Sequence, residues 1–161
     1  INSVQTTVDG IQTQLDHIPP AWSQALPAAE RFVLVLDDAA VLDKETGLVW
    51  EQSPNTTARA WLDAQIFCNQ RVVGGRKGWR LPVVQELASL VDSTQSSPAL
   101  PAGHPFTIVQ LSNYWSATTF ADNTSLAWVV LLDDGDVVDA FDKASNAFVW
   151  CVRGGQGVDP Q

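Results

Sequence analysis

The chain has 161 residues, of which 45% are hydrophobic, and it contains seven tryptophans and six phenylalanines. This length fits one ordinary domain with an appendage, and the aromatic side chains are enough for a packed core. Eighteen acidic residues against nine basic ones give a formal net charge of −9. That balance excludes general nucleic-acid binding, because such binding needs a basic face to neutralise phosphates. No run of about twenty apolar residues is present, so we expect no insertion into a membrane.

The start of the sequence and its cysteine content bear on processing and location. The chain begins without an initiator methionine or a signal peptide, and we expect it to be a processed part of a longer protein. Two cysteines and no methionine suit an exported protein, either secreted or held at the cell surface.

The first 20 residues carry a regular apolar stripe. Its members are spaced alternately three and four residues apart: Ile1, Val4, Val8, Ile11, Leu15 and Ile18. Such residues fill the a and d positions of consecutive heptads, and β-branched side chains at most of them favour trimers over dimers. We therefore predict a coiled-coil oligomerisation stalk over residues 1–20 and a homotrimer, with residues 21–30 as a connector. The alternative is an amphipathic helix folded back on its own domain.

From residue 31 the pattern changes to short strands. Alternating apolar residues predict three strands, at residues 32–36, 40–42 and 48–51. A hairpin loop that ends at Gly47 joins the last two.

A helix follows these strands. Thr56 or Thr57 could cap its N-terminus. Trp61, Ala64 and Cys68 lie on one face of it, so we expect Cys68 to point into the domain.

The second half of the chain predicts another helix, a long loop and four more strands. Pro82 suits the first turn of that helix, because its missing N–H is not needed there. Four apolar residues would form the buried stripe of the helix: Val83, Leu87, Leu90 and Val91.

Residues 92–113 are rich in Ser, Pro, Asn and Gly and are typical of a loop, where binding often occurs. The last strands are predicted at residues 114–118, 127–132, 137–141 and 148–153, with a tight turn at Asp134-Gly135. The predicted fold class is α+β, with two helices packed on small, mostly antiparallel, twisted sheets.

Cys151 lies in the last predicted strand, and the chain has one other cysteine, Cys68. We predict a disulfide that ties the first helix of the domain to its last strand. In the chain-entropy description, closing so long a loop removes roughly 4–5 kcal/mol of unfolded-state freedom.

A set of motifs points to a known family. The motifs are Trp61-x-x-Ala64-x-x-x-Cys68, Gly78-Trp79-Arg80-Leu81-Pro82 with Glu86-Leu87, Tyr114-Trp115-Ser116, Ala127-Trp128, and Val149-Trp150-Cys151-Val152-Arg153. In this order and spacing, residues 31–155 resemble the C-type-lectin-like C-terminal domain of the Legionella collagen-like (Lcl) adhesin family. The resemblance implies a stalked, trimeric adhesin at the cell surface. Its heads would bind polysaccharide, sulfated glycosaminoglycans in particular, in attachment to host cells and in biofilm, and residues 156–161 would be a tail.

The densest carboxylate cluster consists of Asp133, Asp134, Asp136 and Asp139. Its oxygens could suit calcium, which needs several converging oxygen ligands. The lectin-like fold often binds sugar through calcium, with a Glu-Pro-Asn triplet and a later Trp-Asn-Asp, and neither is present here. Because aspartates along a strand point to alternate sides, we favour a solvated hairpin tip, with calcium as the alternative, and we predict no cofactor.

No pattern indicates an enzyme. His17 and His104 have no partner at metal-ligand spacing, and no nucleophile-elbow pattern is present. We interpret Arg80 and Glu86 as a structural ion pair, because a buried arginine needs a partner. The rival class is the formylglycine-generating type of oxidase, which shares the lectin-like fold but needs two catalytic cysteines at one metal in an open cleft.

The densest positive patch is a Gly-rich loop with Arg71, Arg76 and Lys77 and no acidic residue. Arginine can donate two hydrogen bonds to one sulfate group, so we predict that an anionic polysaccharide binds here. Tyr114 or Trp115, next to the long loop, could stack on a sugar. Two alternatives stay open: the loop is merely solvated, or the domain is a phage-type or diversified receptor-binding head for protein ligands.

Overall fold

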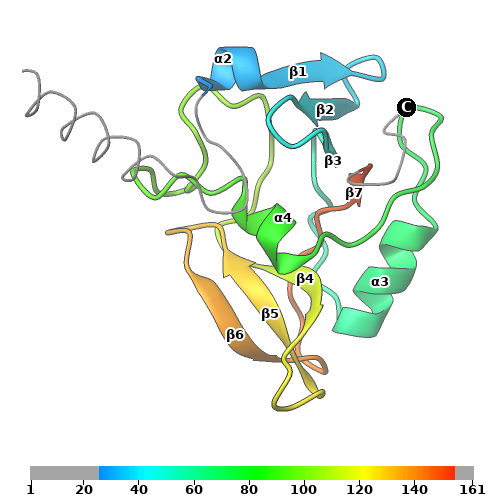
Figure 1. Cartoon of the computed structure of the whole chain (residues 1–161). Helices are drawn as coiled ribbons and strands as arrows, with labels where there is room; N and C mark the ends of the chain where they lie inside the picture. The colour runs from blue at the N-terminus through cyan, green and yellow to red at the C-terminus, as the bar shows by residue number, and fades with distance from the viewer. Residues whose placement is uncertain (1–25, 155–161) are drawn as a thin grey trace, which may run out of the picture.

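The computed structural model describes residues 26–154, so the predicted stalk, the first half of the connector and the predicted tail lie outside the described residues. The described part is an α+β domain with two small antiparallel sheets, which confirms the predicted fold class (Figure 1). Within residues 26–154, no helix combines the length and the apolar character that crossing a bilayer requires.

The first sheet has the strand order β1-β2-β3-β7. It is built from β1 (Phe32–Val35), β2 (Ala40–Asp43), β3 (Val49–Glu51) and β7 (Val152–Arg153). The first three strands lie where the alternating pattern predicted them. A short helix, α2 (Ala28–Arg31), precedes β1, so residue 31 ends a helix and does not begin a strand. The turn after β1 places Leu36, Asp37 and Asp38 at positive φ.

The second sheet has the order β4-β5-β6, from β4 (Asn113–Thr119), β5 (Leu126–Leu131) and β6 (Val137–Asp142). All three strands were predicted within a residue or two. Gly135 lies in the turn between β5 and β6 at φ +87°, and a Cβ there would lie 2.6 Å from Val91 Cγ1. The turn therefore requires glycine for its conformation and also for its close approach to the loop after α4.

The helix α3 (Trp61–Asn69) begins later than expected. The prediction that Thr56 or Thr57 caps it is wrong, since the N-cap is Ala60 and it makes no side-chain hydrogen bond. A segment distant in sequence but adjacent in space replaces the cap, because Lys143 O accepts a hydrogen bond from Trp61 N at 3.0 Å. A tertiary contact thus satisfies a helix N–H group that a local side chain usually satisfies.

The helix α4 (Val84–Ala88) follows Pro82 with one residue between them. Its buried stripe is shifted from the prediction: Val84 and Leu87 are buried, whereas Val83 is 39% exposed. Val83 serves at the helix start, where its backbone N donates to Glu86 Oε1 at 2.9 Å.

The predicted strand at residues 148–153 is wrong in its extent. Only its last two residues form β7, while Phe148 makes a single parallel bridge to Tyr114. This segment runs between the two sheets (Figure 1), and it changes partners from Tyr114 to Trp50 along its length. One continuous ladder cannot form when the partner changes within a few residues.

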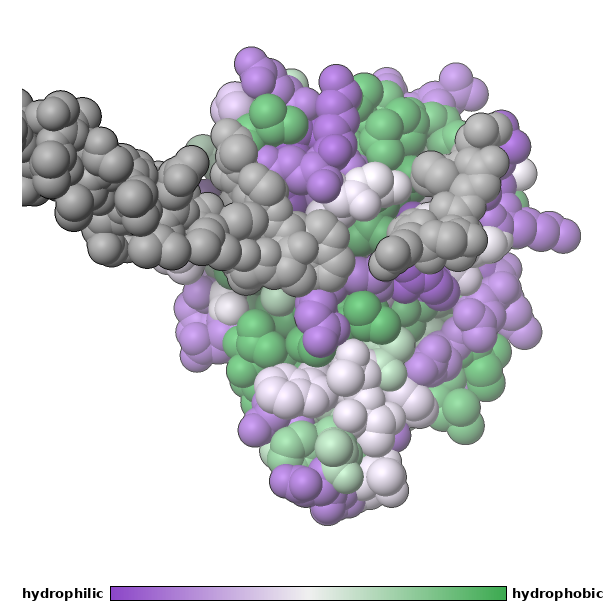
Figure 2. Space-filling view, in the orientation of Figure 1, coloured by the Kyte–Doolittle hydropathy of each residue, from purple (hydrophilic) through white to green (hydrophobic). Residues whose placement is uncertain are grey.

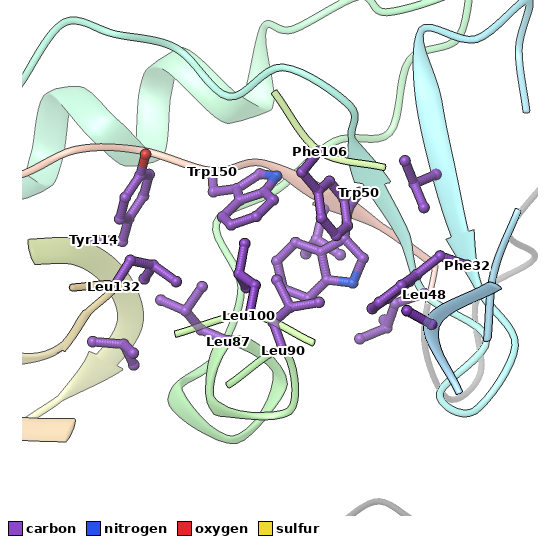
Figure 3. Packing of buried hydrophobic residues seen from close by; sticks show 14 of the residues in the cluster. Phe32, Leu48, Trp50, Leu87, Leu90, Leu100, Phe106, Tyr114, Leu132 and Trp150 are labelled. Atoms are coloured by element: carbon purple, nitrogen blue, oxygen red, sulfur yellow. The ribbon is translucent and has the colours of Figure 1, made fainter. Parts of the chain in front are cut away.

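Two apolar clusters fill the domain. In the first, the Trp150 ring contacts those of Trp50, Phe106 and Tyr114, with centroids 5.7, 4.8 and 5.7 Å apart (Figure 3). The long loop of residues 92–112 has no helix or strand, as predicted, yet it contributes Phe106 and Leu100 to this cluster. The second cluster includes Cys68 and Cys151, which form a disulfide.

Candidate anion-binding surface

The Gly-rich loop after α3 is anchored to the domain at both ends. Val73 and Arg76 form a small hairpin through two backbone hydrogen bonds of 3.1 and 2.9 Å. Gly74, at φ +56°, packs so closely on the turn after β1 that a Cβ there would lie 2.6 Å from Leu36 Cβ. The buried Trp79 donates its indole N–H to Arg76 O at 2.8 Å. The loop is therefore held in place while it presents side chains to solvent.

Two of the three predicted basic residues, Arg76 and Lys77, are exposed on this loop. Within residues 26–154, neither has a carboxylate at ion-pair distance. Figure 2 shows hydrophilic side chains around α3 and the loop that follows it, on the right of the view, with hydrophobic patches between them. These two cations are available to an anion from solution.

The third predicted residue, Arg71, has an internal partner. Its Nε donates to Glu51 Oε2 at 2.8 Å, and the Glu51 side chain is only 2% exposed. Burial raises the pKa of Glu51, while hydrogen bonds from the Cys151 backbone and from Arg71 act in the opposite direction. Arg71 thus stabilises a buried carboxylate, and its positive charge is largely compensated.

Basic residues distant in sequence join this surface, although no local sequence pattern connects them with it. Arg153 Nε donates to Lys77 O at 2.7 Å, and its guanidinium lies beside Gly78. Arg80 makes the ion pair expected of it, with two hydrogen bonds of 2.7 Å to Glu86 and a third to Gly154 O. Arg80 is therefore a structural residue at the edge of the surface.

Arg59 also lies here, through the ring of Phe67 on α3. The Arg59 guanidinium lies 4.3 Å from the centre of this ring, and the Arg71 guanidinium lies 5.1 Å from it. The two arginines precede and follow α3 in the sequence, so their meeting at one ring could be anticipated only once the bounds of that helix are known.

The model of one protein family matches the chain over residues 39–153, and it describes the Lcl C-terminal domain. The chain belongs to the Lcl C-terminal domain family. Membership indicates an adhesin-like domain and an extracellular location. No curated protein matches the chain.

The expectation that Tyr114 or Trp115 stacks on a sugar is wrong for this Lcl C-terminal domain. Both side chains are 0% exposed. The Tyr114 hydroxyl accepts a hydrogen bond from Gln110 N, and Trp115 donates its indole N–H to Arg59 O at 2.7 Å. Tyr114 packs against the rings of Phe148 and Trp150, and Trp115 packs against the ring of Phe141, so both faces of β4 are covered.

The aspartate cluster of this Lcl C-terminal domain forms a hydrogen-bonded turn. Asp133 Oδ1 accepts from Ser97 Oγ at 2.7 Å, and Asp134 Oδ1 accepts from Asp136 N at 3.0 Å. In the described part of the chain, no three His, Cys, Asp or Glu side chains come together as a possible metal site. These contacts do not support the calcium alternative.

Proposed function

We propose that this domain is the non-catalytic head of a surface adhesin and binds anionic polysaccharides, sulfated glycosaminoglycans among them, through the surface around Arg76 and Lys77. The observation that carries the proposal is the pair of exposed cations on an anchored loop, without a carboxylate partner in residues 26–154. The guanidinium fork and the ammonium group are both good donors to sulfate.

The net charge of −9 opposes such binding only at long range. At physiological salt, charges separated by more than roughly 8 Å are largely screened. The local surface therefore decides whether an anionic group can bind, and six of its residues are basic: Arg59, Arg71, Arg76, Lys77, Arg80 and Arg153.

We further propose that the head has the C-type-lectin-like fold and that the heptads of residues 1–18 assemble three copies. Weak single sites on three heads would then act together on one polysaccharide chain through effective concentration. Such avidity suits attachment to host cells and to a biofilm matrix.

A charge-removal experiment tests the proposal. The variant Arg76→Ser/Lys77→Ser should bind heparin-derived oligosaccharides at least about tenfold more weakly, since one hydrogen bond to a charged group contributes roughly 1.5–3 kcal/mol. Binding is measured by calorimetry at two salt concentrations, and added salt should weaken it for the unmodified chain. Arg71 is left unchanged, because its removal would leave the Glu51 carboxylate buried and unpaired.

Lys44→Ser is the matched control. Lys44 is exposed and follows Asp43, whose register partner is Phe32, so it lies at the opposite end of β1 from Leu36 and the Gly-rich loop. The Lys44→Ser variant should bind like the unmodified chain. Equal weakening by Lys44→Ser, or salt-independent binding, would show that Arg76 and Lys77 do not form the site.

A further inference from the structure

We infer that Arg59, Phe67 and Arg71 form a subsite for one oxyanion group, a sulfate or a uronate carboxylate, of the same polysaccharide that binds Arg76 and Lys77. This inference rests on the proposed function and extends it to Arg59 and Phe67, which no sequence pattern indicated. We call these three residues the arginine–phenylalanine subsite.

The backbone at Arg59 is fixed on both sides. Arg59 N and O form a reciprocal pair of hydrogen bonds with Ala147, each 2.9 Å long. The same carbonyl oxygen accepts the indole N–H of the buried Trp115. The side chain therefore leaves a rigid strand-like position, which reduces the entropy lost when it orders on a ligand.

The Arg59 guanidinium has an aromatic neighbour but no anionic one. It lies over Phe67, and within residues 26–154 no carboxylate is at ion-pair distance from it. Its Nε–H is buried and has no hydrogen-bond acceptor among the described residues. A buried donor without an acceptor is costly and calls for an explanation. The guanidinium also lacks an anionic neighbour, and an anion at its outer nitrogens would compensate its charge.

Arg71 supplies the second half of the subsite. Glu51 occupies its Nε–H, which orients the guanidinium against the same ring, and its side chain is still 33% exposed. Two cations at one ring repel each other, while Glu51 compensates only one of them. The charge of Arg59 is the one left without a counter-charge, so an oxyanion would bind at Arg59, and Arg71 would add to the positive potential at the same ring.

The arrangement also specifies the kind of ligand. The half-buried Phe67 ring already contacts two guanidinium groups, so it offers little free surface to a sugar ring. Recognition at this subsite is therefore by charge and by the planar guanidinium fork. A neutral glycan lacks the group that the subsite binds.

The test uses the full chain and three variants. Arg59→Gln should weaken binding of a sulfated heparin oligosaccharide about tenfold at an unchanged melting temperature. Arg59→Lys, which keeps the charge but loses the fork, should bind with intermediate affinity. Lys44→Gln is the charge-matched control and should bind normally. A comparison of sulfated heparin with unsulfated heparosan distinguishes sulfate from uronate as the group that is bound.

A second readout does not depend on the variants. In the unmodified chain, titration with inorganic sulfate should shift the arginine side-chain Nε–H resonance of Arg59 in a nitrogen–proton NMR spectrum, and sodium chloride at equal ionic strength should not. An Arg59 resonance that sulfate leaves in place would overturn the subsite, whether or not a polysaccharide binds.

The outcomes separate the two proposals. If Arg59→Gln binds as tightly as the unmodified chain while Arg76→Ser/Lys77→Ser loses binding, the subsite is wrong and the proposed function stands. If no anionic polysaccharide binds the unmodified chain, the proposed function fails, and so does the assignment of this subsite to a polysaccharide.

Discussion

At the scale of single residues, burial decides what each polar side chain can do. Tyr114 is the sole tyrosine of the chain, and its hydroxyl accepts a hydrogen bond from Gln110 N at 2.8 Å inside the core. Burial raises its pKa to about 12, the Gln110 hydrogen bond acts against this rise, and the charge of Glu51 adds to it. The native state therefore holds the phenolic proton more tightly than the unfolded chain does.

This proton predicts how stability falls at alkaline pH. The ordinary pKa is 10.0, so the contribution of Tyr114 is fully present below pH 10 and is lost as the pH rises towards 12. The loss in the free energy of unfolding should be on the order of 3 kcal/mol. In the native protein, tyrosinate absorbance should appear about two pH units higher than in the chain unfolded by urea. Ionisation near pH 10 while circular dichroism is still native would contradict a buried Tyr114.

At the scale of elements, the disulfide connects parts of the domain that the sheets alone would leave loosely joined. Cys68 lies on α3, and Cys151 precedes β7, 83 residues later. Cys151 N also donates to Glu51 Oε1 at 2.8 Å. The disulfide and this hydrogen bond together fix α3, β3 and the C-terminal segment relative to one another, beneath the proposed binding surface.

Reduction should destabilise the domain by about 4 kcal/mol, because a loop of this length gains much freedom in the unfolded state when it opens. Urea unfolding of the oxidised and the reduced wild-type chain measures this difference without changing a side chain. The intact mass of the native protein should rise by two hydrogens on reduction. Two thiols that titrate in the untreated native protein would rule out the bond.

At the scale of the whole molecule, the charges are unevenly distributed. Six of the nine basic residues lie between residues 59 and 80 or at residue 153, close to α3 and the Gly-rich loop. An acidic protein with one basic surface orients a polyanion towards that surface. Three copies would present the surface three times.

The predicted stalk can be tested by solution assembly. Val8→Asn/Ile11→Asn should weaken the trimer, because each change removes an apolar side chain from the a/d seam, while the head stays folded. Thr7→Asn, outside the apolar stripe, is the control and should assemble normally. Light scattering with circular dichroism measures both properties. A monomeric unmodified chain, or a trimer that persists without residues 1–18, would show that the stalk does not drive assembly.

Features that depend on neighbouring residues could be predicted from the sequence. Strands β1 to β6 lie where their apolar and β-branched residues predicted them, and the tight turn at Gly135 follows from its sequence. The exposed position of Arg76 and Lys77 follows in the same way, since a glycine-rich polar loop has no apolar face to bury.

Only the tertiary structure decided which side chains are covered and which are paired. Tyr114 is buried because a segment more than thirty residues later crosses β4, and Arg71 is compensated because β3 places Glu51 beside it. Arg59 meets Arg71 only because both reach the ring of Phe67. Local periodicity specifies the conformation of the backbone, but exposure and ion pairing depend on residues brought together from distant parts of the chain, and these do not appear in any local pattern.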